Sequence, residues 1–212
     1  MYSIDHVVLA VDDLDAAGEQ MRRECGLASV PGGVHPGWGT GNRIVPRGAG
    51  YVKLISVVDP STGRGTRLGR ALLELVAGGR DRWFAVCLST DDLDAVASRL
   101  GLEVEQGART RPDGRALRWR GAGIDDEARE PWLPFFIEWD MPPALHPGRI
   151  RVANDVDATG IRRVEVGGNE ARLRDWLGPP DGQVPISIVD GDPAVRAVVL
   201  DVEGRALRIE AP

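Results

Sequence analysis

Asp12-Asp13-Leu14-Asp15-Ala16 returns unchanged as Asp91-Asp92-Leu93-Asp94-Ala95, so one five-residue string occurs twice in a chain of 212 residues. Each copy follows a short apolar run and opens a stretch whose apolar residues have helical spacing. An internal repeat identifies the supersecondary unit from which a fold is built. The chain is therefore predicted to be duplicated, with a unit made of a strand, an Asp-capped helix and three further strands.

Residues 1–58 form the first predicted unit. The β-branched, apolar run Ile4–Val11 is typical of a buried strand. Asp12 or Asp13 can cap the next helix, because a carboxylate oxygen accepts the free amide hydrogens of a first turn, and Gly26 can end it. Three strands are predicted at 28–34, 40–47 and 50–58, where Gly and Pro turn signals separate them.

The remaining sequence divides in the same way. Residues 59–81 are a polar connection with a short amphipathic helix, and residues 82–140 are the second unit, with a helix capped by Asp91 or Asp92. After a Pro-rich connection at 141–160, a third and weaker unit is predicted at 161–212. An odd number of units leaves open whether the third packs against the pair or against another chain in a homodimer.

Composition narrows the class of protein. The formal net charge is -6 and 42% of the residues are hydrophobic, with acidic and basic residues interspersed, so no nucleic-acid partner is expected. No apolar run approaches the roughly 20 residues that cross a membrane, and we expect a soluble, cytoplasmic protein without a membrane partner. Cys25 and Cys87 are expected to be reduced core residues. Lys53 is the only lysine.

Four motifs carry a family resemblance. They are Ile4-Asp5-His6-Val7-Val8, His35-Pro36-Gly37-Trp38-Gly39-Thr40-Gly41-Asn42-Arg43, Tyr51-Val52-Lys53-Leu54-Ile55 and Pro134-Phe135-Phe136-Ile137-Glu138-Trp139-Asp140. In this order they resemble the glyoxalase-like domain of the vicinal oxygen chelate superfamily. The resemblance implies an α+β fold in which two βαβββ units place curled sheets side by side and form a cup, here with a third related βαβββ-like unit at the C-terminal end.

The resemblance also implies a site. Family enzymes hold a divalent metal in the cup with His and Glu side chains, and the metal chelates two neighbouring oxygens of the substrate. His6 stands at the first-strand histidine position, but Lys53 stands where a glutamate ligand is expected, and a protonated amine cannot ligate a metal. Zn, Ni, Mn or Fe would therefore be held by His6 and Glu138, with His35 or His146 as a further ligand only if their loops fold over the cup. The alternative is that the site binds no metal.

The candidate catalytic residues are His6 and Glu138, which can move a proton, and the candidate ligand-binding residues are Lys53, His35, Trp38 and Asn42. Lys53 and Glu138 would form a buried pair on neighbouring strands that anchors a carboxylate. The alternatives are that His6 is a structural histidine and that Lys53 points outward.

Two functions follow from this set. The first is a small-molecule-binding enzyme, a lyase or isomerase that acts beside a carbonyl on an anionic or oxygen-rich ligand. The second is a protein that binds or sequesters such a molecule without converting it, because its metal site has degenerated.

Overall fold

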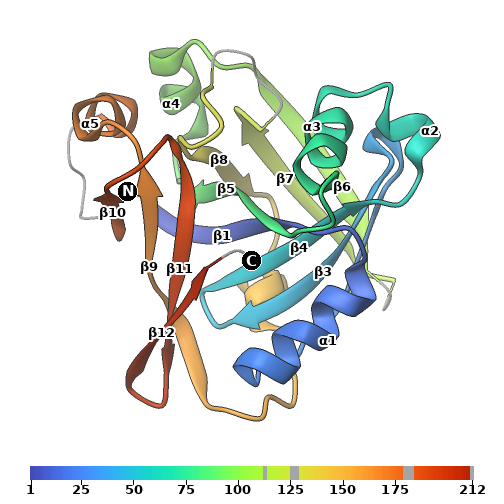
Figure 1. The fold of residues 1–212 in the computed structure, drawn as a ribbon. Coiled ribbons are helices and arrows are strands. Elements are labelled where there is room, and N and C mark those ends of the chain that lie inside the picture. Colours follow the sequence, from blue (N-terminus) through green and yellow to red (C-terminus); the bar gives the residue numbers. More distant parts are fainter. Residues whose placement is uncertain (112–113, 125–128, 179–183, 211–212) are drawn as a thin grey trace.

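The computed structural model describes residues 1–111, 114–124, 129–178 and 184–210, and its main feature is an eight-stranded sheet (Figure 1). The strands are β1 (Ser3–Ala10), β2 (Val30–His35), β3 (Thr40–Arg47), β4 (Gly50–Val57), β5 (Arg82–Ser89), β6 (Val104–Thr110), β7 (Ala116–Ala122) and β8 (Phe135–Trp139). Their order is β2-β3-β4-β1-β5-β8-β7-β6. In each half the first strand pairs in parallel with the last, and β1 and β5 join the halves in antiparallel fashion.

The repeated string begins the equivalent helices α1 (Leu14–Cys25) and α4 (Leu93–Leu100). The side chains of Asp13 and Asp92 accept hydrogen bonds from backbone amides of the first turns, so the second of the two candidate caps is used in each copy. Both helices end at a glycine with φ near 70°, Gly26 and Gly101, a conformation that disfavours any side chain. The two copies of the repeated string therefore form helices with equivalent N-caps and C-caps, as the duplication predicts.

The C-terminal part has the predicted element order but a different pairing. It consists of β9 (Ala158–Gly167), α5 (Glu170–Leu177), β10 (Ile186–Val189), β11 (Ala194–Val202) and β12 (Arg205–Glu210). The strand order is β10-β9-β11-β12, so the first strand lies between the second and the third. In the other two units the first strand pairs with the fourth. The C-terminal unit is therefore βαβββ-like in element order, as predicted, but its strands pair in a different order from those of the first two units.

The four-stranded sheet packs against the convex side of the large sheet, beside α5 (Figure 1). Val164 and Val198 belong to the same apolar core as Val7 and Val86. Two indoles also cross the boundary: Trp83 Nε1 donates to the carbonyl of Ile209 (3.3 Å), and Trp176 Nε1 donates to that of Pro134 (2.9 Å). The C-terminal unit therefore packs within the chain.

The concave side of the large sheet is partly filled by the 59–81 connection. This connection forms α2 (Pro60–Gly63) and α3 (Arg67–Val76). Leu68 and Leu72 of α3 pack with Val8, Ala10 and Ile55 on the inner faces of β1 and β4. The helix closes one end of the cup and leaves the other end hollow. None of the described helices is long and apolar enough to span a bilayer.

The 141–160 connection is fastened to the β3–β4 hairpin. The amide of Gly48 donates to the carbonyl of Gly148 (2.9 Å), within the short 3₁₀ turn Pro147–Arg149. A Cβ atom at position 148 would lie 2.3 Å from the Gly50 carbonyl oxygen, which leaves no room for a side chain. Further along, the side chain of Asn154 accepts from the amide of Ala28 (2.9 Å).

Gly148→Ala is expected to lower the free energy of unfolding by about 1–3 kcal/mol, the usual cost of overpacking a rigid contact. The measurement is urea denaturation followed by tryptophan fluorescence. Gly160→Ala is the matched control, because a Cβ at that position meets no atom within 4 Å. Equal stability of the two variants would mean that the connection is not held against the hairpin.

Candidate functional site

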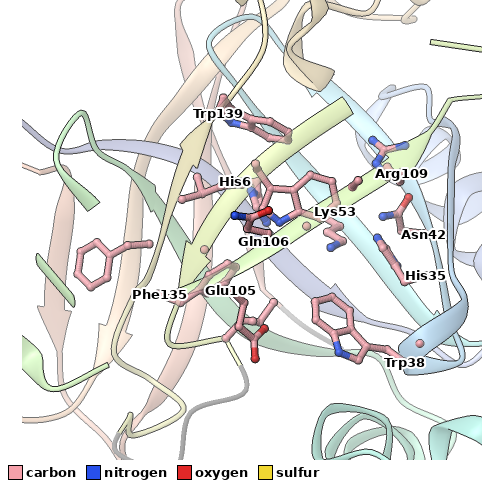
Figure 2. Close-up of a pocket in the computed structure, with 18 of the residues that line it drawn as sticks. His6, His35, Trp38, Asn42, Lys53, Glu105, Gln106, Arg109, Phe135 and Trp139 are labelled. Carbon is pink, nitrogen blue, oxygen red and sulfur yellow. The ribbon is translucent and has the colours of Figure 1, made fainter. Parts of the chain in front are cut away.

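The concave side holds a cavity of about 540 Å³ between the two halves of the large sheet (Figure 2). Five of the six predicted site residues line it: His6, His35, Trp38, Asn42 and Lys53. The second half contributes aromatic walls, chiefly Trp119, Phe135 and Trp139, and the side chain of Arg109. A largely aromatic cavity with a few polar groups is typical of a small-molecule site.

A β-bulge in β1 places Asp5 and His6 on the same side of the sheet. Ile4 pairs with Leu88 on β5, and His6 pairs with Cys87, the residue next to Leu88. Asp5 is therefore an extra residue without a counterpart across the strand pair. Successive residues of a regular strand point to opposite faces, and a bulge changes this by one residue. Asp5 and His6 consequently lie on the same side of the sheet and contact each other.

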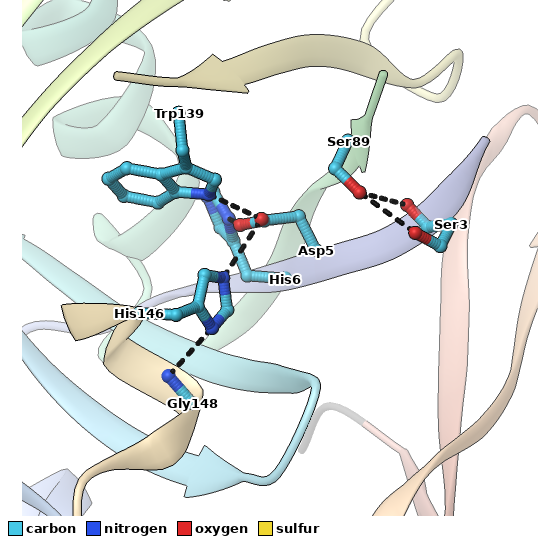
Figure 3. A network of polar contacts seen from close by, with 7 residues as sticks. All are labelled: Ser3, Asp5, His6, Ser89, Trp139, His146 and Gly148. Carbon is cyan, nitrogen blue, oxygen red and sulfur yellow. Dashed lines mark hydrogen bonds and ion pairs between the residues drawn. The ribbon is translucent and has the colours of Figure 1, made fainter. Parts of the chain in front are cut away.

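The carboxylate of Asp5 is fully hydrogen-bonded (Figure 3). His6 Nδ1 lies 2.6 Å from Oδ1, and Oδ2 accepts from Trp139 Nε1 (2.7 Å) and from His146 Nε2 (3.0 Å). Burial by itself raises the pKa of Asp5, but the hydrogen bonds from His146 and His6 outweigh it and hold the pKa well below its ordinary value. An ionised carboxylate only accepts, so both histidines donate to it.

His6 is left with one free nitrogen. Its Nδ1 donates to Asp5, and the buried Nε2 has no hydrogen-bond partner among the described residues. Burial lowers the pKa of His6 below 6.5, and Asp5 offsets only part of this effect. The ring also stacks on Tyr51, with centroids 4.6 Å apart. His6 is therefore a neutral imidazole, fixed in one tautomer, with an unused lone pair.

Lys53 places a buried cation near His6 in the cavity. It is 8% exposed and lines the cavity, so the alternative in which it points outward is excluded. On the paired strands β1 and β4, His6 lies opposite Tyr51, and Lys53 comes two residues later, so Lys53 and His6 are diagonal neighbours on one face. Burial lowers the pKa of Lys53 to about 8, and the nearby Arg109 cation contributes. At neutral pH Lys53 is still mostly an ammonium.

Arg109 brings a second buried cation to the cavity from β6. Its guanidinium donates to the backbone carbonyl of Gly32 on β2, so it links the two edges of the large sheet. Lys53 and Arg109 are each less than a tenth exposed, whereas Glu105, which also lines the cavity, is exposed. The buried part of the cavity is therefore positively charged and suits an anion.

The other predicted ligand-binding residues lie near these cations. His35 Nδ1 is 3.1 Å from the hydroxyl of Thr40, and burial lowers the pKa of His35 to about 2, with Lys53 and Arg109 contributing. Asn42 is buried, and its Oδ1 has no partner among the residues described. This amide fits because position 32 is glycine, where a Cβ would lie 1.8 Å from Oδ1. Both side chains are neutral polar groups in the cavity wall.

Glu138 does not belong to the site. Ile137 and Trp139 line the cavity, so the residue between them on β8 points to the opposite face. There Glu138 pairs with Arg120 (3.3 Å), which also contacts Asp94 of α4. The predicted His6–Glu138 metal pair and the predicted Lys53–Glu138 ion pair are not formed. β4 and β8 are also not neighbours, because β1 and β5 lie between them.

A different group could hold a metal: Asp5, His6 and Cys87, whose ligand atoms all lie within 4.8 Å of one another. The details fit a metal poorly. A metal ion would have to replace the hydrogen bonds that already occupy both oxygens of Asp5. Burial raises the pKa of the Cys87 thiol well above its ordinary value, although ligation requires a thiolate, and the Lys53 ammonium lies in the same region. The residues present do not match the metal site that the resemblance implies.

The roles of three residues of the site could not be predicted from the sequence. Asp5 was missed because alternation along a strand places it on the face opposite to His6, and a bulge has no signal in this sequence. Arg109 comes from an edge strand that meets β2 only when the sheet curls. His146 was noted only as a third metal ligand, whereas it donates to Asp5.

The family model described as "Glyoxalase-like domain" matches residues 4–178. A hypothetical protein from Staphylococcus aureus has a similar fold, with a TM-score of 0.69, 18% identity and 99% of both chains covered. Methylmalonyl-CoA epimerase from Mycobacterium tuberculosis has a TM-score of 0.45 and 22% identity, over 63% of this chain and 85% of its own. None of the curated proteins matches the chain.

Lys53→Met is expected to stabilise the protein at pH 7, by about 3 kcal/mol, because it removes a cation whose pKa is lowered by burial from 10.5 to about 8. Between pH 8 and 10.5 the unfolded chain binds more protons at Lys53 than the native state does. The contribution of Lys53 to stability therefore rises with pH, and the advantage of the variant shrinks.

Urea denaturation of both proteins at pH 7 and pH 10 measures this difference. Lysine-selective ¹⁵N labelling adds a direct measurement, because the chain has a single lysine and gives one Nζ signal. A titration midpoint near 10.5 would contradict the buried position of Lys53.

Proposed function

Because the chain belongs to the glyoxalase-like domain family, we propose that its cavity binds a small carboxylate and moves a proton at the carbon beside a carbonyl or carboxyl group, as a lyase or isomerase that needs no metal. One observation carries this proposal. His6 lines the cavity and has a buried Nε2 without a hydrogen-bond partner among the described residues, and the ammonium of Lys53 lies on the adjacent strand and the same face.

His6 is suited to act as the general base. Its Nδ1–H is held by Asp5, so the proton that it takes up goes to Nε2, and the resulting imidazolium is stabilised by the adjacent carboxylate. The lowered pKa of His6 keeps Nε2 unprotonated at neutral pH. The same imidazolium can return the proton to the substrate, which completes an isomerisation.

Lys53 is suited to stabilise the charge that develops. When a proton leaves the carbon, the electron pair moves onto the neighbouring oxygen, and an ammonium beside that oxygen stabilises the enolate. In the family's metal enzymes a divalent ion has this role. Here Lys53 stands at the position of a ligand and supplies the positive charge itself, while Arg109 provides a second cation for a carboxylate.

The aromatic walls complete the site. Trp119 and Trp139 contact each other, with ring centroids 5.8 Å apart, and Phe135 lies edge-on to His6 at 5.6 Å. These rings give the second half of the cavity an apolar wall, and charge interactions are stronger where water is excluded.

Exchange of hydrogen for deuterium at carbon tests the reaction. The protein is incubated in D₂O with a panel of short 2-oxo, 3-oxo and dicarboxylic acids, and ¹H NMR follows loss of the C–H signal beside the carbonyl. We expect exchange with at least one compound, and a decrease of about 10²–10⁴-fold in His6→Gln, because that variant lacks the base. Binding without exchange would favour the alternative function of a binding or sequestering protein. Absence of both binding and exchange would contradict the proposal.

The affinity for the carboxylate is expected to fall as the pH rises through about 8, because Lys53 loses its proton there. Tryptophan fluorescence at a series of pH values gives the dissociation constants, since three tryptophans line the cavity. Lys53→Met should bind weakly at every pH and lose this step. An affinity that is the same at pH 7 and pH 9 would exclude Lys53 as the anion anchor.

A further inference from the structure

We infer that His146 is a positioning residue for His6, acting through Asp5, so that the connection beyond the two βαβββ units completes the site. This inference rests on the proposed role of His6 as a base. His146 lies far from His6 in the sequence, and its side chain donates to Asp5 and not to His6.

The hydrogen bonds of His146 determine its tautomer. The amide N–H of Gly148 donates to His146 Nδ1 (3.2 Å), so Nδ1 carries a lone pair. Neutral imidazole then has its hydrogen on Nε2, which lies 3.0 Å from Asp5 Oδ2 and donates to it. His146 is 9% exposed, and both of its nitrogens are used inside the protein (Figure 3). Its ring is thereby fixed in orientation and in tautomer.

Asp5 links His146 to His6, because one of its oxygens contacts each histidine. Its Oδ2 is held by His146 and Trp139, so the carboxylate cannot rotate, and Oδ1 remains directed at His6 Nδ1. The three donors come from three parts of the chain: β1, β8 and the 141–160 connection. Without His146 only the Trp139 indole would hold Oδ2. A carboxylate that holds a histidine in one tautomer keeps the other nitrogen free as a base.

Packing shows that the connection is built to hold His146. Its ring lies edge-on to Tyr51 and to Trp139, with centroids 5.6 and 5.5 Å away. The next turn is fastened to the β3–β4 hairpin through Gly148, whose carbonyl accepts from the Gly48 amide and whose own N–H donates to the ring. The same few residues therefore dock the connection and set the direction of Nε2.

Two substitutions separate positioning from simple packing. In His146→Gln the side-chain amide nitrogen reaches the place of Nε2 and can still donate to Asp5. In His146→Asn the side-chain oxygen takes the place of Nδ1 and can still accept from Gly148, but the amide is too short to reach Asp5. Asn154→Ala is the control, because it loosens the same connection at the Ala28 amide without touching Asp5.

The measurement is ¹⁵N NMR of the full chain with labelled histidine, which gives signals for three residues. In the native protein and in His146→Gln, His6 is expected to show a single tautomer with its hydrogen on Nδ1. In His146→Asn a second tautomer should appear, with partial loss of the Nδ1–H signal. Asn154→Ala should keep the native His6 signals and lose only stability.

A native His6 pattern in folded His146→Asn would overturn the inference. If His146→Asn does not fold, the inference is overturned by two tautomers of His6 in the folded His146→Gln variant. This readout requires no substrate, so it is independent of the proton-exchange assay. Absence of exchange together with a shifted His6 pattern would reject the proposed reaction and retain the positioning role.

Discussion

The site depends on one extra residue in the first strand. A regular strand would send Asp5 and His6 to opposite faces, and the carboxylate would be buried in the apolar core on the convex side. The bulge instead turns both side chains toward the concave side, where His6 Nδ1 meets Asp5 at 2.6 Å. A buried carboxylate is tolerated there because three donors satisfy it. The tautomer of His6, the free Nε2 and the use of His146 all follow from this bulge.

The proposed chemistry of this glyoxalase-like cup uses cations of the protein in place of a metal ion. Lys53 stands where the resemblance implies an acidic ligand, and the cavity contains two buried cations, which would repel a metal ion. A buried ammonium is costly, and burial lowers its pKa for the same reason. Such a group is stabilised when an anionic ligand binds beside it. The energetic cost of burying Lys53 and the proposed affinity for anions are therefore two consequences of one placement.

Much of the fold could be predicted from the sequence, because its signals are local. Asp13 and Gly26, and their counterparts Asp92 and Gly101, mark the helix ends by their own side-chain and backbone properties. Most of the site residues were found for a similar reason, since His6 and Lys53 occur in recognisable motifs. The failures are not local. The register of β8 placed Glu138 on the outer face, and the pairing of β9 depends on which neighbours the folded sheets offer.

The contact between Asp5 and His6 needs a bulge, and the role of Arg109 needs closure of the sheet, so neither could be inferred before the strands were placed.

A crystal structure of the protein with a bound short oxo acid tests the account most directly. We predict the carboxylate or carbonyl oxygen beside Lys53 Nζ and the adjacent carbon within reach of His6 Nε2. A ligand bound elsewhere, or a His6 Nε2 already hydrogen-bonded to a protein group, would contradict the account.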